Sequence, residues 1–203
     1  YLHKNAIIHG EILAKQGASI IDIGGQSTRP GSESISYNEE RKRVISVIEN
    51  LSDRFLISVD TNKSKIMRDA INAGAKIIND ITSLSNDKDS VKEISSTQCG
   101  LILMHSQGAP KIMQQNPQYN DVILDIFDYF EERIKFCEQH GIDRSRLIID
   151  PGIGFGKNDN HLRRLMKHIS IFHGFGCPIL LGSSRKSFIG RWRKKEKEED
   201  RLG

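Results

Sequence analysis

Six short apolar runs, each ending in polar residues, constrain the fold of this chain more than any other feature. The runs are SIIDIGG, FLISVDT, KIINDI, LILMH, LIIDPG and PILLGSS. They are rich in Ile, Leu and Val and show little polar alternation, which is typical of strands covered on both faces in a parallel sheet. The runs therefore predict an α/β protein.

Segments of helical periodicity separate these runs. Residues 37–51 place Val44, Ile48 and Leu51 on one stripe, and residues 61–74 and 120–140 carry similar stripes. Strand and helix thus alternate in repeats of about 30 residues, the size of a βα unit. A doubly wound sheet and a (β/α)8 barrel are both built from such units.

The polar residues at the strand ends favour the barrel. They are Asp22, Asp60, Asn79 with Asp80, His105, Asp150 and residues 183–186. A doubly wound sheet concentrates its site at one switch point. A barrel instead collects polar residues from many strand ends into one mouth. A complete barrel needs eight strands, so we expect an incomplete barrel or one whose outer strands lie outside this sequence.

Composition narrows the class of protein. The chain has 203 residues and a net charge of +4, and the segment 191–201 mixes both signs, which favours a solvated helix over a nucleic-acid surface. No apolar run approaches the roughly 20 residues of a membrane span, and the first residues do not resemble a signal peptide. The three cysteines are far apart, which predicts unpaired thiols in a reducing cytoplasm.

The strand-end carboxylates suggest a ligand rich in N–H donors. Asp60 and Asp150 each follow an apolar run, where burial is costly unless a partner compensates. Helix capping is the alternative for Asp60, because Thr61 and Asn62 also precede a helix. Several acids and an amide on one rim instead fit a 2-amino-4-oxo heterocycle, whose ring N–H and exocyclic amine can both bond one carboxylate.

Two further motifs carry less specific signals. The run DPGIGFGK contains Gly152, Gly154 and Gly156, which indicate either a ligand-contacting backbone or a plain βα loop. The run GSSRKSFIG offers hydroxyls and two cations, a plausible anion site or a solvated Arg-Lys pair. For His105 we prefer a satisfied core histidine, and no spacing predicts a zinc site.

Five segments together resemble one family, the dihydropteroate synthases. They are DIGGQSTRPGS at 22–32, SVDT with AGAKIINDI within 58–81, LMHSQGAPKIMQQNP at 104–117, IIDPGIGFGK at 148–157 and GSSRKSFIG at 182–190. The resemblance implies a (β/α)8 barrel that joins a 6-hydroxymethyl-7,8-dihydropterin diphosphate to p-aminobenzoate, giving dihydropteroate and diphosphate. The implied cofactor is Mg²⁺ on the leaving group.

The resemblance also implies a role for particular residues. The pterin-binding residues would be Thr28, Asp60, Asn79, Asp150, Phe155 and Lys186, of which Phe155 also walls the second-substrate pocket. The catalytic residues would be Thr28, Arg29 and Lys186, and the p-aminobenzoate-binding residues would be Arg29, Pro30 and Ser187. Thr28, Arg29 and Pro30 would lie on a loop that closes over the reacting centre. Asp22 and Arg185 would support the site.

The sequence departs from the family pattern in three places. Gln26 replaces the usual acid of the first motif, and we expect this to be tolerated because an amide keeps the acceptor. The family's first strand, with an Asn that binds Mg²⁺, is absent, so we expect no metal ligand within this sequence. The last strand, with its Arg and His, is also absent. We therefore expect a single barrel domain over residues 1–203, truncated at both ends, and by resemblance a homodimer that sulfonamides inhibit.

Two other functions are compatible with these residues. A methyltetrahydrofolate-type methyltransferase shares the ring-binding acids, although STRPG and SRKS favour the synthase. A non-catalytic barrel fragment is supported by the missing strands.

Overall fold

A curved parallel sheet forms the centre of the computed structural model, which describes residues 3–27, 32–107 and 117–193. Its strands are β1 (Ile20–Gly24), β2 (Leu56–Asp60), β3 (Ile77–Asp80), β4 (Gly100–Met104) and β5 (Leu147–Asp150). Their order is β1-β2-β3-β4-β5, so each strand pairs with its successor in the sequence. A doubly wound sheet would reverse this order at a switch point. The order therefore agrees with the predicted barrel arrangement.

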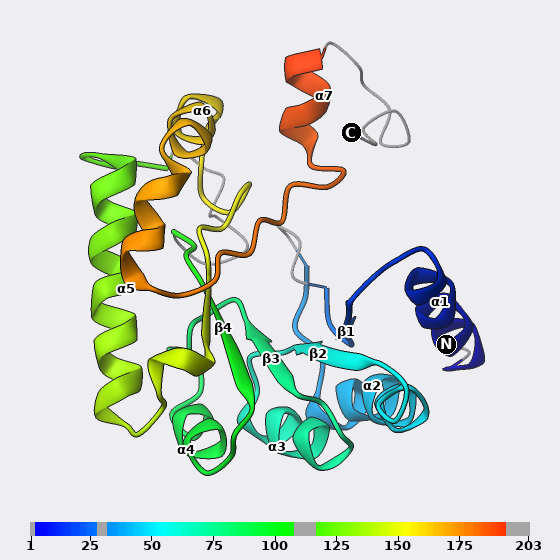
Figure 1. Ribbon diagram of the computed structural model, residues 1–203. Coiled ribbons are helices and arrows are strands. Elements are labelled where there is room, and N and C mark those ends of the chain that lie inside the picture. The colour runs from blue at the N-terminus through cyan, green and yellow to red at the C-terminus, as the bar shows by residue number, and fades with distance from the viewer. Residues whose placement is uncertain (1–2, 28–31, 108–116, 194–203) are drawn as a thin grey trace.

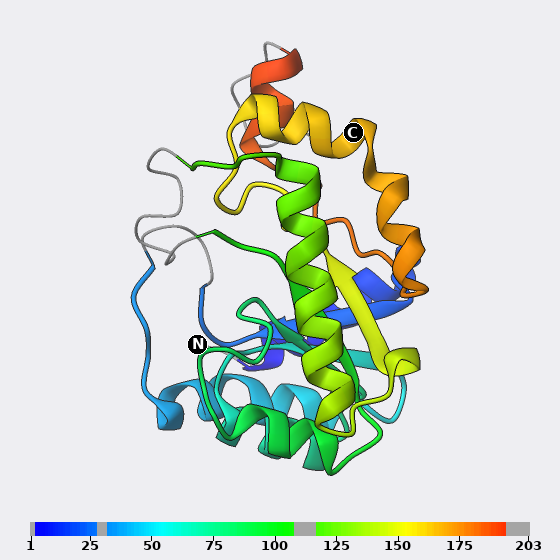
Figure 2. The ribbon, with the colours of Figure 1, turned by 90° about the vertical axis from the view of Figure 1, so that its left-hand side faces the viewer.

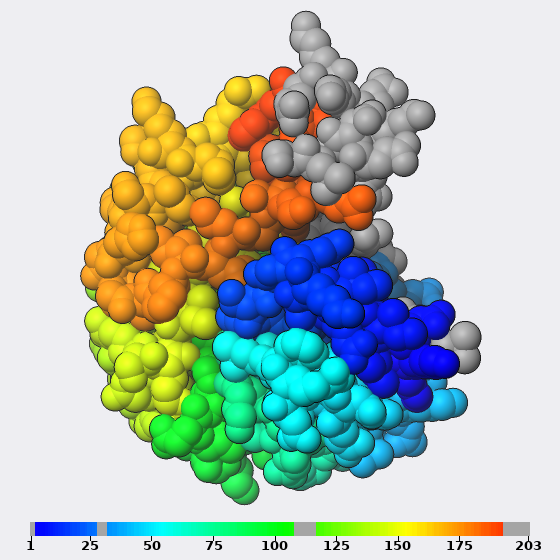
Figure 3. All heavy atoms as spheres, turned by 45° about the vertical axis from the view of Figure 1, so that its right-hand side comes forward, coloured from blue at the N-terminus to red at the C-terminus, as the bar shows by residue number. Residues whose placement is uncertain are grey.

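The helices of the described residues are α1 (His3–Lys15), α2 (Tyr37–Leu51), α3 (Ser64–Asn72), α4 (Ser90–Ser95), α5 (Val122–Gln139), α6 (Asp159–Lys167) and α7 (Ser187–Arg193), with 3₁₀ helices η1 (Arg144–Arg146) and η2 (Ile169–Phe175). Helices α2 to α5 lie along the outer side of the sheet, whereas α6 and α7 lie beyond one of its ends (Figure 1). Figure 2 shows α5 in front of the sheet, and α6 crosses the upper end of α5. Figure 3 shows α1 packed against α2 on the outer surface.

Local sequence explains why the predicted helices form. The bounds of α2 coincide with the predicted 37–51, and its first turn is capped by Ser36, whose side chain accepts a bond from the Glu39 amide. Helix α5 is capped in the same way by Asp121. Helices α3 and α5 lie inside the predicted segments 61–74 and 120–140.

The core lies between the outer face of the sheet and these helices. Alternate strand residues point outward and are fully buried there, among them Ile57, Val59, Ile78, Leu101 and Leu103. The opposite, inner face mixes apolar residues, such as Ile102 and Met104 of β4, with the polar residues near the strand ends. Ile20 and Leu56 lie there and are 44% and 41% exposed, which fits a barrel that these residues do not close.

The sixth predicted strand is wrong. The run PILLGSS forms only a single bridge, between Ile149 of β5 and Ile179. Two hydrogen bonds carry it, because the Ile149 amide donates to the Pro178 carbonyl and the Leu180 amide donates to the Ile149 carbonyl. The next β5 donor in a parallel ladder would be residue 151, which is a proline and has no N–H. The ladder therefore stops after one step.

Candidate active site at the carboxyl ends of the strands

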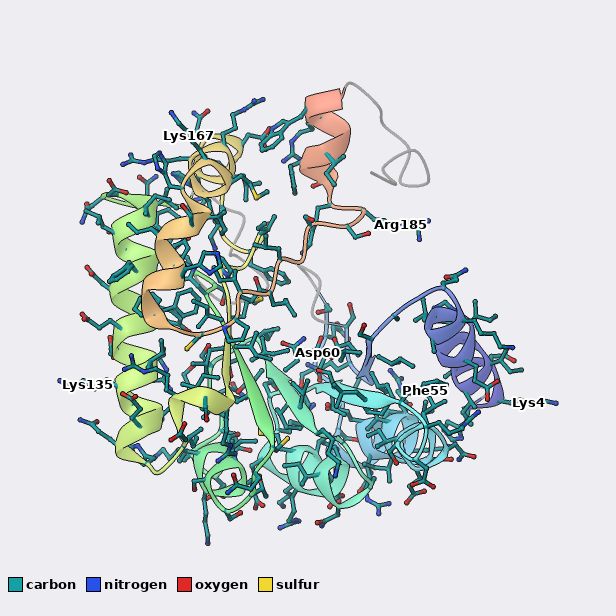
Figure 4. The ribbon with its side chains drawn as sticks, viewed as in Figure 1. Lys4, Phe55, Asp60, Lys135, Lys167 and Arg185 are labelled. Atoms are coloured by element: carbon teal, nitrogen blue, oxygen red, sulfur yellow. The ribbon has the colours of Figure 1, made fainter. Side chains whose placement is uncertain are left out.

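Strand register places three of the predicted pterin-binding residues on one face of the sheet. Gly24 pairs with Asp60, and Asp60 pairs with Asn79. Asp150 pairs with Met104, two residues after Ile102, which pairs with Asn79. Registered partners and residues two apart share a face, so Asp60, Asn79 and Asp150 all face the inner side. Figure 4 shows Asp60 on this side, away from α2 and α3.

A contact across β2 shows how strongly the sheet curves. The side-chain amide of Asn79 on β3 donates to Oδ2 of Asp22 on β1, over 3.3 Å. In a flat sheet, strands two apart are separated by about 9–10 Å. Curvature therefore brings the predicted supporting residue Asp22 into contact with a predicted pterin-binding residue.

Asp150 is the most buried carboxylate of the inner face, with 7% of its surface exposed. Burial raises the pKa of its carboxyl group, while the Gly152 amide and the nearby positive charges of Lys157 and Lys186 act to lower it. The Gly152 N–H donates to Oδ1 of Asp150 over 2.8 Å. The surroundings thus counter the burial of this carboxylate with donors and positive charge.

The glycines after Asp150 allow its loop to pass very close to the backbone of residues 105–107. Gly152 has φ +68°, and a Cβ there would lie 1.9 Å from the carbonyl oxygen of His105. Gly156 has φ +62°, and its Cβ would lie 2.6 Å from the carbonyl oxygen of Gln107. Both conditions exclude an ordinary side chain. At these two positions, the structure supports a packing role for the glycines.

Sequence reasoning assigned no role to Lys157, which joins these two segments. Its ammonium lies 3.0 Å from Nδ1 of His105 and donates to the carbonyls of Gly152 and Phe155, each over 3.0 Å. Lys157 is 3% exposed and His105 is 6% exposed. The preferred reading of His105, a satisfied core histidine, is confirmed. A lysine that follows a glycine run gives no sequence signal of such contacts.

Phe155 and Lys186 meet at the edge of the inner face. The Lys186 ammonium lies 4.3 Å from the centre of the Phe155 ring, a cation–π contact. The adjacent Arg185 is exposed and has φ +57° in the turn before α7. Figure 4 shows Arg185 on this turn. Two residues predicted from separate motifs are therefore neighbours.

Ser187 is tied to its own helix. Its hydroxyl accepts a hydrogen bond from Nη1 of Arg191 over 3.0 Å. Arg191 in turn forms a bidentate ion pair with Asp159 at the start of α6. These contacts link α7 to α6 and fix the position of Ser187.

Gln26 behaves as the sequence predicted, through its acceptor oxygen. Oε1 accepts bonds from the Ile35 amide over 3.0 Å and from the Lys63 ammonium over 2.8 Å. Lys63 also pairs with Glu40, a carboxylate on α2 that is 1% exposed. Glu40 accepts a hydrogen bond from the Thr61 hydroxyl over 2.6 Å. This network lies at one edge of a small hollow lined by Gln26, Glu40, Asp60, Thr61, Asn62 and Ile81.

One of the polar strand ends, Asp80, faces the other side of the sheet. Asp80 points to the outer face and is fully buried, where it accepts bonds from the amides of Thr82 and Leu84. Burial raises the pKa of its carboxyl group. Helix α3 begins at Ser64 after the N-cap residue Lys63. Asp60 is therefore not its N-cap residue, which removes the capping alternative.

Thr28, Arg29 and Pro30 lie outside the described residues. Within the described part of the chain, no group of three or more His, Cys, Asp and Glu side chains could hold a metal ion. Asp22 and Asn79 offer oxygen donors on the inner face but are bonded to each other. Mg²⁺ in proteins is commonly held by one or two side-chain oxygens together with substrate phosphates and waters, so the upstream ligand that the resemblance implies stays a prediction.

Comparison with known proteins decides the family. The family model described as "Pterin binding enzyme" matches residues 3–202. The dihydropteroate synthase of Escherichia coli (strain K12) is 46% identical over 189 residues, which is 92% of this chain and 67% of that protein. This chain belongs to the dihydropteroate synthases. The dihydropteroate synthase of Bacillus subtilis (strain 168) is 40% identical, and the match covers 92% of this chain and 64% of that protein.

Solved structures of dihydropteroate synthases have the same fold. The Yersinia pestis enzyme in a sulfonamide drug complex superimposes with a TM-score of 0.92 at 41% identity, covering 97% of this chain and 71% of that one. The Xanthomonas albilineans enzyme with 4-aminobenzoic acid gives 0.92 at 39% identity, covering 98% and 71%. The synthase function and the α/β barrel predicted from sequence are thus confirmed at the level of the family. The incomplete barrel agrees with this partial coverage.

Among the described residues, no helix combines the length and apolar character needed to cross a bilayer.

Proposed function

We propose that the protein containing this chain condenses 6-hydroxymethyl-7,8-dihydropterin diphosphate with p-aminobenzoate. The observation that carries the proposal is the set of Asp60, Asn79 and Asp150 on the inner face of one curved sheet. Lys186 and Phe155 lie in contact beside the Asp150 loop. Family membership supports the same reaction, because a Xanthomonas albilineans relative has been solved with 7,8-dihydropteroate.

In the proposed reaction, the C–O bond between the pterin methylene and the diphosphate breaks. Its electron pair leaves with diphosphate, and the arylamine nitrogen forms the new C–N bond and then loses a proton. The transition state is cation-like on carbon, so fixed carboxylates on the pterin edge stabilise it. Asp150 would accept hydrogen bonds from the ring N–H and the exocyclic amine of the pterin. Asp60 and Asn79 would form hydrogen bonds with the rest of that edge.

Lys186 and Ser187 would act on the remaining substrate groups. Lys186 would bond the carbonyl side of the pterin, and Phe155 would wall the p-aminobenzoate pocket. Ser187 would bond the benzoate carboxylate. Thr28, Arg29 and Pro30 remain proposed for the reacting centre. Asp22 and Arg185 remain proposed as supporting residues.

The proposal includes four properties of the whole protein. Mg²⁺ would neutralise the negative charge that builds on the leaving diphosphate. Residues 1–203 belong to one barrel domain, which the single five-stranded sheet supports. A cytoplasmic location is supported by three unpaired, buried cysteines. A homodimeric assembly rests on the family resemblance alone.

One assay tests the proposed reaction. The full-length protein is given the dihydropterin diphosphate, labelled p-aminobenzoate and Mg²⁺, and labelled dihydropteroate is the expected product. A parallel reaction offers methyltetrahydrofolate and a corrinoid acceptor. Methyl transfer without dihydropteroate would identify the methyltransferase instead, and neither product would favour the non-catalytic barrel.

A further inference from the structure

Lys157 is a buried cation held entirely by neutral groups. Its ammonium contacts Nδ1 and the carbonyl oxygen of His105, at 3.0 and 3.3 Å, and the carbonyls of Gly152 and Phe155, at 3.0 Å each. None of the ion pairs found among the described residues includes Lys157. Burial of an amine among neutral partners favours its uncharged form, so hydrogen bonds and not an ion pair hold this side chain.

The charged and titratable groups around Lys157 define its electrostatic setting. Burial lowers the pKa of Lys157 to about 7, with Asp150 raising it and Lys186 lowering it. Burial and the adjacent Lys157 lower the pKa of His105 to about 2, so this imidazole is neutral at ordinary pH. The pKa of His161 is also lowered, mainly by burial and to a smaller extent by the charge of Lys157.

The contacts of Lys157 adjoin two proposed pterin-binding residues, Asp150 and Phe155. Gly152, whose carbonyl Lys157 binds, is also the residue whose amide donates to Asp150. Phe155, whose carbonyl Lys157 binds, carries the ring beneath the Lys186 ammonium. The same ammonium reaches His105, directly after β4. The main chain already joins the two strand ends, because the His105 amide donates to the Asp150 carbonyl over 2.9 Å. Lys157 adds a second tie, between the end of β4 and the 152–155 loop.

We propose that Lys157 is a positioning residue for pterin binding: it joins the segments that follow β4 and β5 and thereby fixes Asp150 and Phe155. The inference rests on the proposed function, because it concerns the same pocket. Lys157 touches no substrate in this scheme and acts through the 152–155 loop. Geometry errors of about 1 Å at such a site can reduce rates or affinities by up to about a hundredfold.

The chain offers a matched control for a purely structural cation. Arg146 also donates to main-chain carbonyls, those of Cys99 over 2.7 Å and Ile94 over 2.8 Å. It joins segments that adjoin β4 and β5, but at their amino ends, opposite the proposed pocket. Replacing Arg146 removes comparable carbonyl contacts without touching the 152–155 loop.

The test compares Lys157→Met and Arg146→Met in the full-length protein. Calorimetry with a non-reacting 2-amino-4-oxopteridine measures pterin affinity, and steady-state assays separate the KM values of the two substrates. Urea unfolding measures the stability of each variant, and binding is then compared under conditions in which both variants are folded. Lys157→Gln, which keeps amide donors, is the second variant in case Lys157→Met does not fold.

We expect Lys157→Met to weaken pterin binding at least about tenfold, with a smaller change in the KM for p-aminobenzoate. Lys157→Gln should lie between it and the wild type. Arg146→Met should lose stability but bind pterin as the wild type does. Equal pterin affinity in folded Lys157 variants would overturn the positioning role while leaving the synthase assignment intact. A wild-type protein that neither binds pterin nor forms dihydropteroate would overturn both.

Discussion

Asn79 and Asp80 are adjacent in β3 yet face opposite sides of the sheet. Asn79 reaches Asp22 across the inner face, whereas Asp80 is fully buried behind the sheet and organises residues 82–84. The position of a polar residue along a strand therefore decides whether it can meet a ligand. Residue type alone does not separate the two roles.

This distinction can be tested with two separate variants, one on each face of the sheet. Asp150→Asn keeps the side-chain shape but removes the charge and one acceptor, so the bidentate contact with the pterin is lost. We expect pterin affinity to fall at least about 30-fold, which corresponds to about 2 kcal/mol. Calorimetry measures the effect in the full-length protein. The control is Asp80→Asn, which should lower stability and leave pterin affinity within about twofold, and unchanged affinity in Asp150→Asn would refute its role.

His105 should make the protein sensitive to acid. Its pKa is about 2 in the fold, against 6.5 for a free histidine. Between these values the unfolded chain binds one more proton than the folded chain, so stability falls as pH drops below about 6.5. The slope from this residue reaches at most about 1.4 kcal/mol per pH unit.

Urea unfolding between pH 5 and 7 measures this contribution. The comparison is between the wild type and His105→Gln, whose neutral side chain keeps an acceptor for Lys157. The wild type should lose more stability than the variant as the pH falls. Parallel pH profiles for the two proteins would show that His105 is not responsible.

At the scale of elements, the glycine loop after β5 is set by sterics. Gly152→Ala combines a positive φ with a Cβ that would lie 1.9 Å from the His105 carbonyl oxygen. Gly176 has the same φ of +68°, but no atom lies within 4 Å of its Cβ position. We expect Gly152→Ala to lose at least about 3 kcal/mol of stability and Gly176→Ala about 1 kcal/mol, as measured by urea unfolding. Similar losses would mean that the loop can move aside.

The sequence predicted elements well where the signal was local. The stripe of Val44, Ile48 and Leu51 predicted helix α2, because these residues form its buried face. The sixth strand failed because its pairing depends on Pro151 of another segment, which cannot continue the ladder.

The same limit applies to the candidate site. Asp60, Asn79 and Asp150 could be predicted, because strand ends in parallel sheets share one edge. The partners of Lys157 could not, because they are a histidine ring and main-chain carbonyls. The Asp22–Asn79 contact was also beyond prediction, since it depends on the curvature of the whole sheet.

At the scale of the whole molecule, the three cysteines report on packing. Cys99, Cys137 and Cys177 are all buried, and burial raises the pKa of the Cys99 and Cys137 thiols to about 11. The thiolate is the reactive form, so these groups should be inert in the folded protein. We expect a thiol reagent at pH 7.5 to label them only at the rate of unfolding, and at once in urea. Rapid labelling of any of the three without urea would contradict the packing described here.

The strand order has a consequence for how this protein is made. In the described part of the chain, each strand from β2 to β5 lies beside the strand that precedes it in the sequence. During translation, each newly emerged strand finds the free edge of its predecessor already synthesised and needs no later segment as a partner. The sheet can therefore assemble from the amino terminus onward, in step with the ribosome.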